Sequence, residues 1–169
     1  LAIALGTATL CLPASTASGS IAWVDALFTA TSAVCVTGLA VVDTGNCFSL
    51  FGQLVILALI QVGGLGVMTI SVFLFRMFGR GVSIRHRLVM QDLFAHTPRE
   101  DIFALVRSII LFTLAAECLG AVLLTLHWVR EYPLPRACYL GIFHSISAFC
   151  NAGFALFPDS MVRYSDSLL

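Results

Sequence analysis

The chain has 169 residues, of which 59% are hydrophobic and 11% charged, and its nine basic and nine acidic residues give a net charge of zero. Soluble domains carry about a quarter charged residues, so this chain has too little charge to cover a surface that faces water. A lipid bilayer is therefore the expected solvent. The balanced charge gives no indication of the basic face that a nucleic-acid partner requires, so no such partner is expected.

The first third of the chain predicts a short helix between two loops. Residues 1–13 are apolar but too few to span a bilayer, which takes about 20 residues, and we expect them to be the outer end of a longer segment. Residues 21–33 form an apolar stretch whose length is typical of a re-entrant or interfacial helix. Residues 34–46 contain two glycines and predict irregular chain.

Two longer apolar segments, residues 51–75 and 102–128, predict spanning helices. The glycines that follow Gln61 would let a neighbouring backbone approach closely. Trp128 is expected in the aromatic belt at the outer interface. The connector over residues 76–101 is rich in arginine, and the positive-inside rule places it in the cytoplasm. Six of the nine arginines cluster from this connector into the start of the second predicted span: Arg76, Arg80, Arg85, Arg87, Arg99 and Arg107.

A second short helix is predicted over residues 137–148, followed by irregular chain over residues 149–160. Pro135 lies near the expected helix start, where a proline costs little. The order of elements thus repeats that of the first part of the chain.

Residues 28–40 and 143–155 align without a gap at an offset of 115 positions and share the pattern Ser-Ala-x-Cys-x-x-Gly-x-Ala. We interpret the match as a duplication. The sequence then predicts an all-α membrane protein of helix–pore loop–helix repeats with re-entrant pore helices, similar to a potassium channel. The first repeat would cover residues 1–80, a cytoplasmic basic linker residues 81–101, and the second repeat residues 102–169.

Irregular backbone at membrane depth is tolerated only where protein buries it or where it lines a watery path. Carbonyl oxygens in such a loop can replace the hydration shell of a cation, and a helix that ends there points its negative dipole end at the path. Gly38 and Gly153 would supply the backbone angles that turn the carbonyls inward. The alternative, that these loops are inert helix ends, stays open.

Three segments, residues 28–45, 51–69 and 143–157, resemble the membrane subunits of Ktr potassium uptake systems, in the Trk/Ktr/HKT superfamily. The resemblance implies four repeats around one pore, with filter loops on the outer side of the cell membrane and potassium bound by backbone carbonyls. It also implies a homodimer, a cytoplasmic ring of nucleotide-binding regulatory subunits, and sodium as an activator. The filters it implies are Val36, Thr37 and Gly38 after Cys35, and Asn151, Ala152 and Gly153 after Cys150.

Several polar residues need a separate account. Glu117 falls inside a predicted span, where acidic residues are functional candidates by default, and we expect it to tie a neighbouring pore loop by hydrogen bonds. His144 is expected to be a packed polar residue, because no second metal ligand is spaced near it. Asp25 suits the start of the first short helix, while Asp43 and Asp159 could lie at the outer mouth. The six cysteines are expected to be small buried hydrophobic residues.

Two other classes of function remain as alternatives to transport. The chain could be an accessory or structural membrane subunit without its own ion pathway. An intramembrane enzyme is disfavoured, because the serines lack a Gly-x-Ser-x-Gly setting and the Asp residues fall near loops. No catalytic residue is therefore expected.

Overall fold

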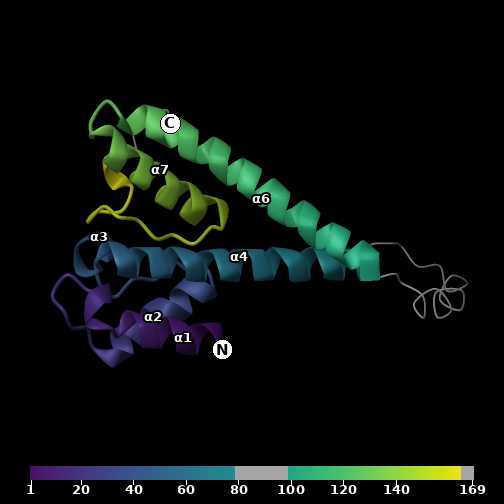
Figure 1. Ribbon diagram of the computed structural model, residues 1–169, viewed down its shortest axis with the longest axis horizontal. Helices are drawn as coiled ribbons and strands as arrows, with labels where there is room; N and C mark the ends of the chain where they lie inside the picture. Colours follow the sequence, from purple (N-terminus) through teal and green to yellow (C-terminus); the bar gives the residue numbers. More distant parts are fainter. Residues whose placement is uncertain (79–98, 165–169) are drawn as a thin grey trace, which may run out of the picture. The chain divides into compact units, whose positions relative to one another are not determined.

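The computed structural model describes residues 1–78 and 99–164, and these residues form helices joined by loops (Figure 1). Within this part of the chain the extended segments make only an isolated antiparallel bridge between Thr16 and Phe48. The helices are α1 (Ala2–Leu10), η1 (Pro13–Ser15), α2 (Trp23–Val34), α3 (Thr44–Cys47), α4 (Leu50–Phe78), α6 (Arg99–Trp128), α7 (Leu134–Phe149) and η2 (Val162–Tyr164).

The two short helices and the two long ones that the sequence predicts are all present, with ends that differ by a few residues. The helix α7 begins three residues earlier than predicted, with Pro135 in its first turn, where a missing N–H leaves no helical bond unmade. Both long helices extend into the expected connector, to Phe78 and from Arg99. The rest of the connector, and most of the predicted basic linker, lies outside the described residues.

The loop predicted over residues 34–46 runs into a single helical turn, α3. Asp43 causes it, because its Oδ1 accepts hydrogen bonds from the main-chain N–H groups of Gly45 (2.9 Å) and Asn46 (3.2 Å). A side-chain cap of this kind stabilises a helix start by about 1 kcal/mol. Asp43, which the sequence suggested for the outer mouth of the ion pathway, thus serves as the N-cap of α3.

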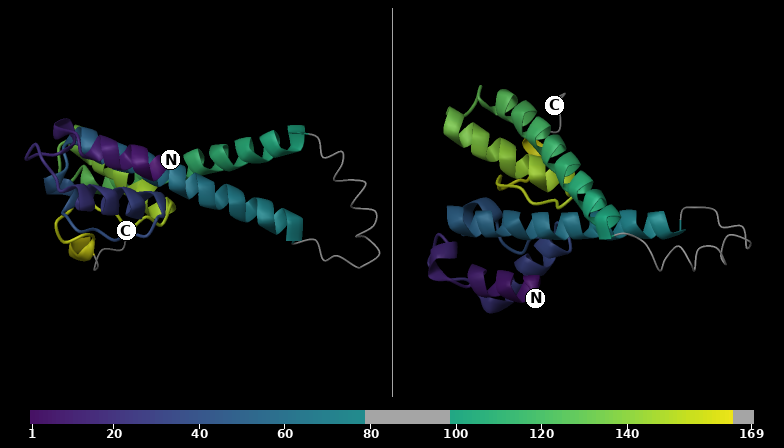
Figure 2. Two further views of the ribbon diagram at one scale, coloured as in Figure 1. Left: turned by 90° about the horizontal axis from the view of Figure 1, so that it is seen from below. Right: turned by 45° about the vertical axis from the view of Figure 1, so that its right-hand side comes forward.

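The chain divides into two compact units: residues Leu1–Gly64 with Ala115–Leu169, and residues Leu65–Leu114. The first unit holds the core, in which α1 and α2 lie side by side (Figures 1 and 2). The shared core residues of α1, α2, α4 and α7 include Leu10, Ala26, Ala30, Ala33, Ile56, Ile60 and Phe143. Three alanines on one face of α2 allow its neighbours to pack close to its backbone.

The second unit consists of the later part of α4 and the earlier part of α6, together with the connector between them. Its described contacts include Thr113, which is buried and whose hydroxyl lies 4.0 Å from the sulfur of Met68.

Two helical stretches, Leu50–Ser71 and Val106–Trp128, are long and apolar enough to cross a membrane, among the residues that the structure describes. The second stretch exposes large apolar side chains along its length, which include Leu111, Phe112, Leu119, Val122 and Leu126. A continuous apolar surface of this kind is unfavourable in water and suits contact with lipid.

Candidate functional site

The first candidate filter turn begins where α2 ends. Cys35 is the last residue with helical angles, and Val36 then takes a positive φ of 55°. The N–H of Val36 donates to the carbonyl of Ala33 (3.3 Å), and the N–H of Thr37 donates to the carbonyl of Ser32 (3.0 Å). These two bonds form a Schellman motif, which closes a helix and reverses the direction of the chain.

The second candidate filter turn follows α7 with the same bonds at the equivalent residues. Asn151 has φ 58°, and its N–H donates to the carbonyl of Ala148 (2.9 Å). The N–H of Ala152 donates to the carbonyl of Ser147 (2.7 Å). The two aligned segments therefore also match in backbone conformation. In each, the residue with positive φ lies two positions after the last residue of the helix.

Glycine closes each turn, again with positive φ: 76° at Gly38 and 69° at Gly153. The two glycines also touch, because a Cβ placed on Gly38 would lie 2.9 Å from the carbonyl oxygen of Ala152 and 3.0 Å from the Cα of Gly153. Backbone angles and close approach thus both require glycine at these positions.

The main-chain oxygens are the polar groups that the two turns have in common, although Ala152 is itself buried and its oxygen lies close to Gly38. Among the described residues, no hydrogen bond ends on the carbonyl oxygens of Val36, Thr37, Asn151 or Ala152. Each set of carbonyls lies at the C-terminal end of a helix, where the partial charge is negative. Groups of this kind favour a cation as ligand.

The helix α4 supports both turns through consecutive glycines. A Cβ on Gly63 would collide with the carbonyl oxygen of Val34, at the end of α2. A Cβ on Gly64 would lie 2.5 Å from the sulfur of Cys150, at the end of α7. The close approach that the glycines after Gln61 predicted is therefore present, and it brings α4 against the start of each turn.

A polar cluster lies behind the second turn. Gln61 of α4 donates from Nε2 to Oε2 of Glu117 at 3.0 Å, and Glu117 is only 5% exposed. The sulfur of Cys150 lies 3.9 Å from Oε1 of both side chains. The hydroxyl of Ser145 donates to the main-chain carbonyl of Glu117 (2.7 Å).

Gln53 anchors the first turn of α4 in a way that the sequence did not reveal. Its Nε2 donates to the carbonyls of Gly45 (3.1 Å) and Phe48 (2.9 Å), and its Oε1 accepts from the hydroxyl of Tyr139 (2.6 Å). Burial raises the pKa of Tyr139 to about 12, so this phenol stays a donor at neutral pH. Gln53 therefore connects α3, α4 and α7.

His144 is packed, as predicted, and it holds the chain beyond the second turn. Its Nε2 accepts from the N–H of Leu156 (3.2 Å), so the proton sits on Nδ1, which lies 2.8 Å from the carbonyl of Leu140. The ring stacks on Phe157 and meets Trp128 edge-on, each at 5.0 Å between centroids. No group of three or more potential metal ligands occurs among the described residues.

The sequence predicted Trp128 in an aromatic belt facing the membrane interface. In the structure its side chain is 1% exposed and packs against protein instead. It packs among His144, Phe157 and Tyr164, the last two of which follow the second turn in the chain. The prediction failed because hydropathy reports the position along a helix and not which face meets other protein.

The remaining singled-out residues have modest roles. Asp25 lies in the first turn of α2, as predicted. Asp159 is exposed beyond the second turn. The cysteines are all free, but the prediction of burial holds only in part, because Cys150 is buried whereas Cys35 and Cys118 are exposed.

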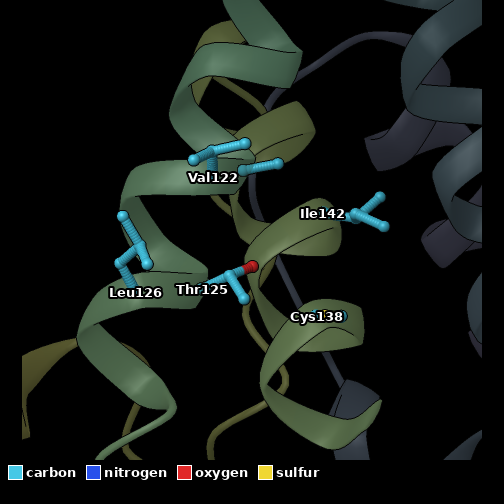
Figure 3. A pocket seen from close by; sticks show the side chains of 6 residues that line it. Val122, Thr125, Leu126, Cys138 and Ile142 are labelled. Atoms are coloured by element: carbon cyan, nitrogen blue, oxygen red, sulfur yellow. The ribbon is translucent and has the colours of Figure 1, made fainter. Parts of the chain in front are cut away.

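An apolar groove lies between α6 and α7 (Figure 3). Its lining is Ala121, Val122, Thr125, Leu126, Cys138 and Ile142. Thr125 and Cys138 are the only lining residues with a polar side-chain atom, so the groove offers no converging polar groups to orient a ligand.

Comparison with known proteins finds a matching family and several relatives that are similar over most of this chain. The family model described as "TrkH: Cation transport protein" matches residues 3–169. The chain is 42% identical over 164 residues to Ktr system potassium uptake protein B of Bacillus subtilis, covering 97% of this chain and 37% of that protein. It is 46% identical over 155 residues to the protein of the same name from Vibrio alginolyticus, covering 92% of this chain and 34% of that protein.

A third relative is the potassium/sodium uptake protein NtpJ of Enterococcus hirae, 37% identical over 161 residues, which are 95% of this chain and 36% of that protein. The chain thus spans little more than a third of the length of each of these relatives.

Proposed function

This chain belongs to the TrkH family of cation transport proteins, and from that premise we propose that the full-length protein takes up potassium across the cell membrane. The relatives named as potassium uptake proteins support potassium as the substrate, at up to 46% identity. Membership of a cation transport family also gives no support to the enzyme alternative.

The observation that carries the mechanism is the pair of matching turns. Val36, Thr37 and Gly38 follow α2, and Asn151, Ala152 and Gly153 follow α7, with positive φ at the first and third residue of each turn. We propose that their carbonyl oxygens bind potassium in place of its water shell. The C-terminal ends of α2 and α7, which precede these turns, would add negative potential near the ion.

The two turns meet at Gly38 and Gly153, so the ion would not pass between these two residues. The family resemblance implies two further turns, and the pathway would lie in front of this pair, closed by the others. In this proposal α2 and α7 are re-entrant pore helices, and the contact between the turns is one side of the filter.

The proposed arrangement places both turns on the outer side and the arginine-rich connector in the cytoplasm. An epitope inserted after Ser83 should then bind antibody only in permeabilised cells. Binding in intact cells would reverse the orientation.

The resemblance and the words "Ktr system" in the relatives' names support further partners. We propose a homodimer in the membrane, a cytoplasmic nucleotide-binding regulatory ring, contact with membrane lipid, and sodium as an activator of uptake, with no other cofactor. Purification of the full-length protein with its mass measured in nanodiscs would test the dimer. Uptake measured with and without sodium would test the activation.

Rubidium uptake tests the central proposal. The full-length protein is expressed in cells that lack their own potassium uptake, beside the variants Gly38→Ser and Gly153→Ser, with the amount of each protein checked by blot. We expect wild type to restore uptake and each variant to lose rubidium affinity or admit sodium as a competitor. Absence of uptake by wild type, or unchanged uptake by well-expressed variants, would favour an accessory or structural subunit.

A further inference from the structure

Glu117 is the one acidic side chain buried in the described part of the chain, and it lies within the apolar stretch Val106–Trp128. A carboxylate in such a place is costly unless hydrogen bonds satisfy it. Its position therefore needs partners, and the structure provides an amide and a thiol.

Three elements meet at this carboxylate. Gln61 comes from α4, Glu117 from α6, and Cys150 is the residue at which α7 gives way to the second turn. The thiol has one proton and lies 3.9 Å from an oxygen of each partner, so it can donate to either of them. Gly64 lies three residues after Gln61, about one turn further along α4. Because it has no side chain, it leaves room for the sulfur of Cys150.

The backbone adds a second link at the same level. The hydroxyl of Ser145 donates to the carbonyl of Glu117 at 2.7 Å and so ties α7 to α6. Ser145 lies five residues before Cys150, on the same helix. The side chain of Glu117 thus contacts Cys150 at the end of α7, while the main-chain carbonyl of Glu117 binds Ser145 further back in the same helix.

The first repeat lacks this cluster. Gly6 packs against Ala30, and Gly120 packs against Ser145, which is the residue equivalent to Ala30 in the alignment of the repeats. Three residues before these glycines stand Ile3 and Glu117. In the described residues Ile3 takes this place in the first repeat and Cys35 is exposed, so the first turn has its conformation here without a counterpart of Glu117.

We propose that Gln61, Glu117 and Cys150 form a clamp that sets the position of the second turn, so that Gln61 and Glu117 are positioning residues for cation discrimination. The proposal rests on the proposed function, because it assumes that Asn151, Ala152 and Gly153 face the ion. Residues that support a binding site rigidly keep its ligands at fixed separations. We therefore expect the clamp to affect which cation the carbonyl oxygens of the second turn accept more than it affects helix packing.

A reciprocal exchange tests the clamp in the full-length protein. Gln61→Glu alone places two carboxylates face to face, and Glu117→Gln alone removes the charge. The double variant Q61E/E117Q restores one amide opposite one carboxylate. Cys118→Ser, at the exposed neighbour of Glu117, is the matched control. For each we would measure the KM and maximal rate of rubidium uptake, competition by sodium, and the thermal unfolding of the purified protein.

We expect Gln61→Glu to raise the KM for rubidium about tenfold and to admit sodium, and the double variant to recover most of that loss, as interacting pairs do. Cys118→Ser should match wild type. An unchanged KM and unchanged sodium competition in a well-folded Gln61→Glu protein would overturn the clamp, as would a double variant no better than the single. If Gln61→Glu does not accumulate, the same readouts on Glu117→Gln decide the question.

Failure of the clamp differs from failure of the proposed function. A wild-type protein that takes up no rubidium refutes transport, and with it the role in discrimination. In that case the unfolding temperatures of the two single variants and the double variant still show whether Gln61 and Glu117 are coupled. Wild-type uptake with unaltered discrimination in every folded variant refutes the clamp alone.

Discussion

Gly38 and Gly153 touch although they are 115 positions apart: a Cβ on Gly153 would lie 2.9 Å from the Cα of Gly38. Both residues also have positive φ, so a side chain at either one meets two separate obstacles. The first obstacle is the left-handed backbone, and the second is the opposing turn. A third glycine allows the two to be told apart.

Gly38→Ala and Gly153→Ala should each lower rubidium uptake by the full-length protein at least about tenfold, because strain and collision together exceed about 1.4 kcal/mol. Gly19→Ala is the control, since Gly19 has φ 78° but nothing within 4 Å of a Cβ. It should cost stability without changing uptake per molecule. Equal losses at all three positions would mean that backbone strain alone matters.

Gly63→Ala and Gly64→Ala test the contact of α4 with the two turns. The added methyl would meet Val34 in the first variant and Cys150 in the second, and overpacking of this kind costs about 1–3 kcal/mol. Gly66→Ala meets no described atom within 4 Å and should be neutral or slightly stabilising, because alanine favours helix. Thermal unfolding in detergent measures all three, and a Gly66→Ala protein as unstable as the others would contradict the packing.

The helices and turns were predictable because they are local. A repeated Ser-Ala-x-Cys-x-x-Gly pattern and two long apolar runs specify where helices lie and where they stop. The sequence also identified Glu117 as a residue that needs partners.

The partners themselves were not predictable. Gln53 and Tyr139 are separated by 86 positions, and Gln61 and Glu117 by 56, so no local pattern pairs them. Trp128 was misplaced for the same reason, since its burial depends on Phe157 and Tyr164, which follow the second turn. The helical turn α3 was missed although Asp43, an ordinary N-cap residue, precedes it.

Val36 and Asn151 occupy equivalent positions with nearly equal φ, 55° and 58°. Asparagine tolerates this conformation, whereas a β-branched residue is strained in it. Val36→Asn should therefore stabilise the protein by about 1 kcal/mol, and Asn151→Val should destabilise it by a similar amount. Val36 packs partly against the core, which reduces the gain. Chemical unfolding of both variants measures the effect, and shifts in the same direction for the two substitutions would count against equivalent turns.

We expect His144 to make the stability of the segment after the second turn depend on pH. It lies outside both apolar spans, and burial lowers the pKa of its ring, although its bond to Leu140 acts in the opposite direction. The neutral ring accepts from the N–H of Leu156, and a protonated Nε2 cannot. The rings packed around it, Trp128, Phe143 and Phe157, carry no charge.

Because the folded-state pKa is the lower one, the unfolded chain binds more protons as the pH falls below about 6.5. The stability that His144 contributes is present above that pH and is lost as the pH falls toward the lowered folded-state pKa. His144→Gln cannot titrate, so its unfolding temperature should change less than that of wild type between about pH 7 and pH 5. Substitution of His127, whose ring meets Tyr164 edge-on, is the control and should leave the wild-type slope in place. An identical pH dependence in wild type and His144→Gln would show that the pKa of His144 is the same in the folded and unfolded chains, which would contradict its burial.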